Sequence, residues 1–109
     1  MTRQEIADLF SPVNLPTTYE FWPIGEAPDL PYICYYFPDS DDFMADNGNF
    51  VKIRRLNIEL YTSTKDFTLE DTVEGILEAN HLGYDKTSLY LESEKMYQIL
   101  YQTEVLING

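Results

Sequence analysis

The order of apolar and polar residues along the chain predicts several β-strands and two α-helices. Apolar residues occupy every second position over most of the stretch 96–107, which is the period of a strand with one buried face. From about Thr68 to Asn80 the apolar residues instead recur three or four positions apart, which predicts a helix with one face on the sheet. Thr68 and Asp71 are the predicted capping residues of this helix. Its sheet-facing residues are Leu69, Val73, Ile76 and Leu77.

A second, shorter helix is predicted at the N-terminus. Thr2 followed by Glu5 fits a capping box, in which each side chain bonds the backbone amide of the other residue. Pro12 and Pro16 then end the helix and begin a loop. Further strands are predicted at 18–24, 32–37, 50–62 and 84–92.

Two local features add detail to the strands. Asn47-Gly48 is a tight-turn signal because both residues tolerate positive φ, so we expect a hairpin in which 43–46 pairs with 49–52. Within 50–62, the apolar residues move from odd to even positions across Arg54-Arg55. A shift of one residue exchanges the faces of a strand, so we expect a β-bulge at this point.

These elements follow one another in the order α-β-β-β-β-α-β-β. The short connection at 93–95 predicts that the last two strands form an antiparallel hairpin. We therefore predict an α+β fold with one domain over residues 1–109. It contains a single mixed or antiparallel β-sheet, about two helices packed on it, and a protruding hairpin around Asn47-Gly48.

The charge of the chain narrows the classes of partner. The formal net charge is -12, which argues against a protein that grips nucleic acid or an anionic membrane surface, since both require lysine and arginine. Nine residues are tyrosine, a side chain that suits half-buried strands and protein interfaces. The N-terminus lacks the apolar core of a signal peptide, and no apolar run is long enough to span a bilayer. We expect a soluble protein made in a cytoplasm.

The residues that most catalytic and metal sites need are scarce. The single cysteine, Cys34, lies in an apolar strand and is expected to be a buried, inert thiol and not a nucleophile paired with His81. Four aspartates between Asp39 and Asp46 suggest calcium, but neither register from Asp39 nor from Asp41 puts glycine at position six and glutamate at position twelve. We expect no catalytic site, no metal and no cofactor.

One charged constellation suggests an interface between copies of the chain. Its basic part is the only cluster of cations in the sequence, and its acidic part is the neighbouring loop. The alternative is pairing within one chain across the same hairpin, or simple exposure to solvent. The candidate interface residues are Asp39, Asp41, Asp42, Phe43, Asp46, Lys52, Arg54 and Arg55.

Three segments in order resemble a known family of phage proteins. They are the Pro- and Gly-rich stretch 23–35 followed by Phe43-x-Ala45-Asp46, the run 58–66, and Tyr90-x-Glu92-Ser93-Glu94-x-x-Tyr97-x-x-x-Tyr101. Over roughly Tyr19 to Val105, the chain resembles the tail-completion or tail-terminator proteins of long-tailed phages and prophages of Gram-positive bacteria. Such proteins are often described only as minor tail or minor capsid components.

The resemblance implies a structural role in virion assembly. Members of the family form a hexameric ring at the head-proximal end of the tail tube, where the ring ends tube polymerisation and takes part in head-tail joining. The implied partners are further copies of the chain, the tail tube protein and the head-tail connector protein. The implied location is the virion, after assembly in the bacterial cytoplasm. DNA would pass through an acidic lumen without specific binding.

Other functions remain open from the residues. Within virion assembly, the chain could be a head-completion adaptor on the connector. In a different class, an acidic inhibitor could mimic DNA and block a nucleic-acid enzyme. A small enzyme is disfavoured by the missing catalytic residue types.

Overall fold

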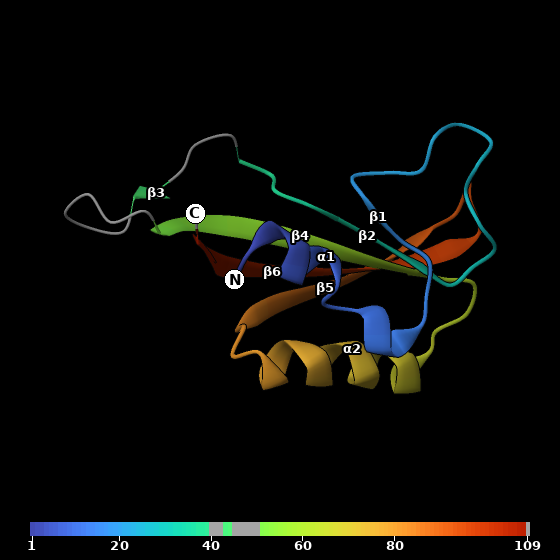
Figure 1. Ribbon diagram of the computed structural model, residues 1–109. Coiled ribbons are helices and arrows are strands. Elements are labelled where there is room, and N and C mark those ends of the chain that lie inside the picture. Colours follow the sequence, from blue (N-terminus) through green and yellow to red (C-terminus); the bar gives the residue numbers. More distant parts are fainter. Residues whose placement is uncertain (40–42, 45–50, 109) are drawn as a thin grey trace.

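The computed structural model describes residues 1–39, 43–44 and 51–108 and has an α+β fold (Figure 1). A mixed, open β-sheet carries two helical segments, as the sequence predicts. The elements in chain order are α1 (Arg3–Ala7), the 3₁₀ turn η1 (Ser11–Val13), β1 (Thr17–Tyr19), β2 (Tyr32–Tyr36), β3 (Phe43–Met44), β4 (Val51–Thr62), α2 (Phe67–Ala79), β5 (Tyr84–Leu91) and β6 (Met96–Asn108).

The sheet is built around the two longest strands, β4 and β6. The strand order is β1-β2-β4-β6-β5, and the short β3 pairs with β4 beside this path. β1 and β2 are parallel, while every other pair is antiparallel. The predicted hairpin of the last two strands is confirmed, because β5 and β6 pair from Tyr84↔Thr103 to Leu91↔Met96.

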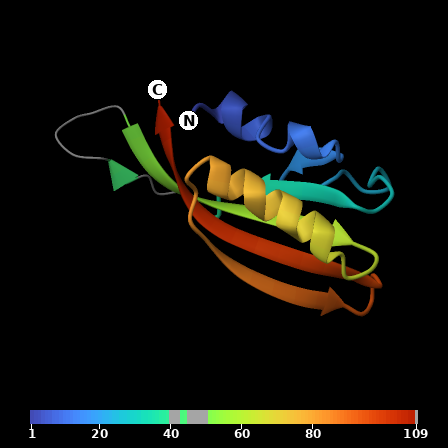
Figure 2. The same cartoon turned by 90° about the horizontal axis from the view of Figure 1, so that it is seen from below.

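The helical segments cover one face of the sheet, which we call the inner face. Seen from below, α2 runs roughly along the strands, and α1 with η1 lies beside it (Figure 2). The two chain ends lie close together at one end of the sheet in the same view. Within the part of the chain that the structure describes, the opposite, outer face carries no helix. The loop between β1 and β2 rises on that side at the other end of the sheet (Figure 1).

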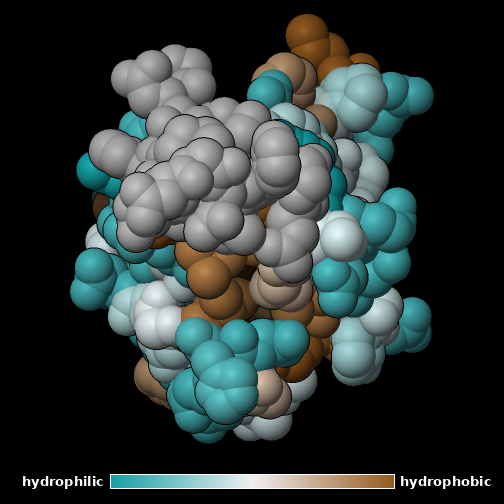
Figure 3. All heavy atoms as spheres, turned by 60° about the vertical axis from the view of Figure 1, so that its left-hand side comes forward, coloured by the Kyte–Doolittle hydropathy of each residue, from teal (hydrophilic) through white to brown (hydrophobic). Residues whose placement is uncertain are grey.

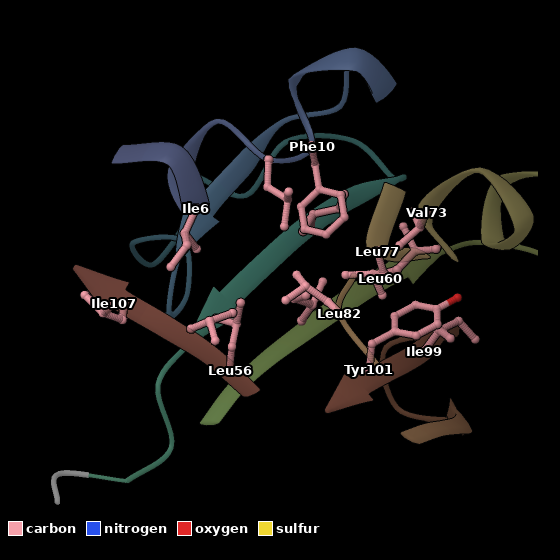
Figure 4. Close-up of a cluster of buried hydrophobic side chains, with 14 residues drawn as sticks. Ile6, Phe10, Leu56, Leu60, Val73, Leu77, Leu82, Ile99, Tyr101 and Ile107 are labelled. Carbon is pink, nitrogen blue, oxygen red and sulfur yellow. The ribbon is translucent and has the colours of Figure 1, made fainter. Parts of the chain in front are cut away.

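The core lies between the inner face and the helical layer (Figure 4). Its strand residues include Leu56, Ile58, Leu60, Ile99 and Tyr101, all with no exposed surface. These side chains come from even positions of β4 and odd positions of β6, which the antiparallel register places on one face. The alternation predicted for β6 is therefore confirmed.

The predicted N-terminal cap of α2 is wrong by two residues. Asp66, and not Thr68, caps the helix, and its carboxylate accepts a hydrogen bond from the Leu69 amide at 3.0 Å. Both residue types are good caps, and starting at Asp66 adds two residues, about half a turn, to the helix. The predicted apolar face is otherwise confirmed, with Val73 and Leu77 fully buried.

The N-terminal capping box is confirmed. The Glu5 amide donates to the Thr2 hydroxyl at 3.1 Å, and the Thr2 amide donates to the Glu5 carboxylate at 2.8 Å. These hydrogen bonds lower the pKa of the exposed Glu5 carboxyl. The cap orients a very short helix whose one buried residue, Ile6, joins the core.

The predicted β-bulge at Arg54-Arg55 is absent, because β4 pairs with β6 in one unbroken register from Val51↔Asn108 to Thr62↔Tyr97. The change of phase has another cause. Ile53 lies on the outer face directly opposite Leu106, so this end of the sheet has apolar residues on its outer side. On the inner face, Arg54 takes the place of an apolar residue and sets its guanidinium carbon 5.6 Å from the centre of the Phe37 ring.

The predicted hairpin is confirmed in its described part, with a register one residue away from the prediction. β3 pairs antiparallel with β4 as Phe43↔Ile53 and Met44↔Lys52, whereas a two-residue turn at Asn47-Gly48 would set Phe43 opposite Lys52. The observed pairing leaves an odd number of residues between Met44 and Lys52, which a two-residue turn does not allow. The Asn47-Gly48 pair itself lies outside the described residues.

The first strand is shorter than predicted. We expected a strand over 18–24, but β1 ends at Tyr19. Glu20 has φ 66°, in the left-handed region, and this turns the chain out of the sheet. The Glu20 amide donates to the Tyr35 carbonyl at 2.7 Å, which holds the turn against β2.

Replacement of a core leucine should destabilise the protein far more than replacement of a surface leucine. Leu60 has no exposed surface, whereas Leu89 is 53% exposed. We expect Leu60→Ala to lower the free energy of unfolding by about 3 kcal/mol, from lost burial and the cavity left behind. Leu89→Ala should lower it by less than about 1 kcal/mol. Urea unfolding measures both, and equal losses would contradict the assignment of the inner face as the core.

Candidate functional site

One end of the sheet narrows to a ribbon made of the two longest strands. Pairing with β2 stops at Asn57 of β4, and pairing with β5 stops at Thr103 of β6. Residues 51–55 of β4 and 104–108 of β6 continue beyond these points, and β3 borders only the β4 side. We call these two segments the arm. A two-stranded ribbon is only marginally stable alone, so the arm depends on what covers it.

The two faces of the arm are unequal. On the inner face, Val105 and Ile107 are 2% and 3% exposed, because the core that includes Ile6 of α1 continues under them. On the outer face, Leu106 is 52% exposed and Ile53 lies directly opposite it. From this end of the molecule, apolar surface is visible in the middle of the view, toward the helical layer, with polar residues beside and below it (Figure 3).

The outer edge of the arm is incompletely paired. Among residues that the structure describes, no strand pairs with 104–108 on the side away from β4. One exposed contact occurs there, in which the N-terminal amine of Met1 donates to the Leu106 carbonyl at 2.6 Å. A partly open strand edge next to an exposed leucine is a surface on which another protein segment can pair and pack.

The structure places those predicted interface residues that it describes around this arm, but the basic ones do not share one face. Strand alternation sends Arg54 to the inner face and Arg55 to the outer face. The Arg55 Nε lies 3.2 Å from Asp39 Oδ2, and the two side chains are 61% and 40% exposed. This pair forms within one chain, so for Asp39 and Arg55 the intrachain alternative holds. An exposed pair of this kind contributes little to stability.

The remaining candidate residues are placed in part. Phe43 and Lys52 are placed by the backbone pairing of β3 and β4. Asp41, Asp42 and Asp46 lie outside the described residues. A contact between these aspartates and the basic residues of a second copy stays a prediction.

A second charged group, missed by the sequence analysis, joins α2 to the sheet. Glu70 is 1% exposed, and its carboxylate lies 3.0 Å from Lys65 Nζ and 2.8 Å from Lys86 Nζ. Lys86 also lies 2.7 Å from Glu74, which accepts a hydrogen bond from the Tyr101 hydroxyl at 2.8 Å. This cluster of two carboxylates, two ammonium groups and a phenol fixes α2 over β5 and β6.

The charges in this cluster shift the titration of its members. Burial lowers the pKa of Lys86, but the carboxylates of Glu70 and Glu74 outweigh it and raise the value to about 12. Burial raises the pKa of Glu74, but hydrogen bonds from Lys86 and Tyr101 bring it below its ordinary value of 4.5. The Tyr101 pKa is raised, first by burial and then by Glu74. Each shift favours the paired state at neutral pH, so the cluster is structural.

The chemistry expected of Cys34 agrees with its surroundings. The side chain is buried, and burial raises the pKa of the thiol to about 11. At neutral pH it is therefore protonated and a poor nucleophile. Within residues 1–39, 43–44 and 51–108, no group of three or more His, Cys, Asp or Glu side chains is arranged to hold a metal ion. No helix in those same ranges is long and apolar enough to cross a membrane.

Comparison of the chain with protein-family models and with curated proteins finds no match.

Loss of the Lys86 charge should weaken the attachment of α2. We expect Lys86→Met to lower the free energy of unfolding by about 2 kcal/mol, because it leaves the buried Glu70 carboxylate with one cation. Since Lys86 is partly exposed, the loss should be smaller than for a fully buried ion pair. Lys95→Met, on the exposed turn after β5, is the control and should change it by less than about 0.5 kcal/mol. Equal effects in chemical denaturation would contradict the structural role of the cluster.

The same cluster sets a dependence of stability on pH. The pKa of Glu74 is lower in the folded protein than its ordinary value of 4.5, so its stabilising effect is complete above that value and is lost as the pH falls through the folded pKa. The pKa of Lys86 is raised from 10.5 to about 12, so its effect is complete below 10.5 and is lost as the pH rises through 12. Thermal unfolding should show Glu74→Gln to be less acid-sensitive than the wild type. An unchanged acid limb would contradict this.

Proposed function

We propose that this protein is a structural component of a phage virion that caps the head-proximal end of the tail tube, ends tube polymerisation and takes part in head-tail joining. The observation that carries the proposal is the arm, in which β4 and β6 run beyond the rest of the sheet. An assembly subunit needs a surface that is complete only when a neighbour covers it. The arm offers an exposed leucine and a partly open strand edge.

The dimensions of the chain support a role through surface contacts. The extents are 48 × 29 × 22 Å and the radius of gyration is 14.6 Å. A compact globule of the same length has a radius of gyration of about 13 Å. An elongated subunit reaches a neighbour with one end while the helical layer keeps its own core closed. Such contacts are heterologous and form a ring when the rotation between copies closes.

The net charge of the chain supports a position in a ring through which DNA passes. A net charge of -12 lets DNA move past a ring without binding to it, provided that acidic side chains line the passage. The same charge makes copies repel one another, so the ring forms where apolar and hydrogen-bonded contacts offset repulsion. Contact with an existing tail tube, which fixes the position of each copy, supplies such conditions.

Deletion of the gene from the phage or prophage genome that carries it should produce tails of uncontrolled length and heads that lack tails. Electron microscopy of the lysate measures tail length, and a plasmid copy should restore infectious particles. Tails of normal length beside free heads would instead indicate a head-completion adaptor. Normal infectious particles after deletion would overturn the proposal and leave the inhibitor class as the next to test.

Complementation by variants locates the contact surface. Leu106 and Leu89 lie on the same outer face and are 52% and 53% exposed, so they form a matched pair. We expect Leu106→Asp to reduce complementation by at least about tenfold and Leu89→Asp to retain it, because a buried aspartate at a contact costs well over 1 kcal/mol. Equal complementation by both variants would remove the arm as the contact.

A further inference from the structure

The outer face of the sheet has an aromatic groove at the end away from the arm. Its floor comes from β2 and β4, one wall from the loop after β1, and the other wall from the turn between β5 and β6. Loop and turn rise on the same side of the sheet (Figure 1). Residues that define its chemistry are Glu20, Trp22, Tyr32, Tyr61, Glu94 and Met96.

The aromatic rings of the groove form a continuous row. The ring centres of Trp22 and Tyr32 lie 6.0 Å apart with the planes at 81°, and those of Tyr32 and Tyr61 lie 5.2 Å apart at 39°. The Tyr61 hydroxyl donates to Glu59 at 3.0 Å and accepts from the Gln98 amide at 2.8 Å. These bonds fix the floor, so the row is organised before any ligand arrives.

The groove is negatively charged. Glu20 and Glu94 stand on opposite walls, and no lysine or arginine is among the residues described as lining it. On the same outer face, beside Tyr61, the Glu59 carboxylate accepts hydrogen bonds from the Tyr61 hydroxyl and the Gln98 amide. Aromatic faces attract cations, and a guanidinium also stacks flat on a ring while it binds a carboxylate in two places. The chemistry of the groove therefore favours arginine.

The backbone of Glu20, in one wall of the groove, has a strained conformation. A non-glycine residue with φ 66° is in a sparsely populated conformation, and such strain often accompanies ligand sites. Beside it, Phe21 is 71% exposed and Ile24 fully exposed, so large apolar side chains border the groove on the same loop. A partner seated there would cover apolar surface as well as meet the two carboxylates.

The volume of the groove and the contacts of this chain's own cationic side chains indicate what kind of group the groove binds. The groove has a volume of about 270 Å³, below the roughly 300–1,000 Å³ of pockets that enclose a whole small ligand, so it suits one side chain. The three arginines of this chain already contact other side chains, Arg55 with Asp39 and both Arg3 and Arg54 with Phe37. The occupant is thus better supplied by a different protein than by a second copy.

We propose that this groove binds an arginine side chain on an exposed segment of a different protein. The guanidinium lies against the row Trp22, Tyr32 and Tyr61 and pairs with Glu20 and Glu94. The inference does not depend on the proposed function, since it uses the opposite end of the sheet from the arm.

Trp22 provides a direct test, because it is the only tryptophan of the chain. The probe is a capped pentapeptide, Gly-Ser-Arg-Gly-Ser, added to the full-length protein while Trp22 emission is recorded. We expect a saturable change with a dissociation constant near about 1 mM, as fits one buried side chain. The same peptide with citrulline, the neutral isostere of arginine, should bind at least about fivefold more weakly. Absence of saturation, or equal binding of both peptides, would overturn the proposal.

A matched pair of double variants separates the groove from the overall negative charge. Glu20→Gln with Glu94→Gln should weaken the arginine peptide at least about threefold. Asp85→Asn with Glu104→Gln removes the same charge from exposed positions elsewhere on the outer face and should leave binding unchanged. Equal loss in both would assign binding to net charge and reject the groove. Emission that changes with protein concentration alone, with a doubled mass, would identify a second copy as the occupant and also reject it.

Discussion

The rest of the structure depends on the pairing of β4 with β6. These two strands are the longest of the sheet, and they pair in one register along the whole of β4. The inner side chains of this pair, Leu56, Ile58, Leu60, Ile99 and Tyr101, are completely buried and supply the centre of the core. Burial of one such side chain contributes about 1.5–3 kcal/mol. β2 and β5 extend the sheet on either side over only part of this length, which makes its two ends different.

The helical layer closes one face, and the proposed binding surfaces lie on the other face and at the ends of the sheet. α2 is attached through the Glu70 cluster as well as by apolar contacts, and the capped α1 reaches the arm through Ile6. At one end, the ribbon of β4 and β6 has an exposed leucine and a partly open edge. At the other, loop and turn enclose aromatic rings between two glutamates. We propose that both surfaces bind other proteins, while burial keeps the Cys34 thiol protonated at neutral pH.

Local signals in the sequence predicted most of the elements, and contacts between distant residues account for what was missed. The period of apolar residues identified β6 and α2, and Thr2 with Glu5 gave the first cap, because these depend on neighbours in the chain. The bulge was wrong because apolar residues at two phases also arise when a straight strand is apolar on both faces, as at Ile53. The Glu70 cluster and the groove join segments far apart in the sequence, so no spacing rule reveals them. The arm residues were singled out in part, but strand alternation divides Arg54 from Arg55.

We propose that the end of the β4–β6 ribbon is completed by a neighbouring protein during assembly. Amide hydrogen exchange of residues 104–107 tests it most directly, measured on the free protein and on the protein mixed with purified tail tubes. We expect amides that face away from β4 to exchange rapidly in the free protein and at least about tenfold more slowly when tubes are present. Exchange at the same rate in both, while the protein is bound to the tubes, would contradict it.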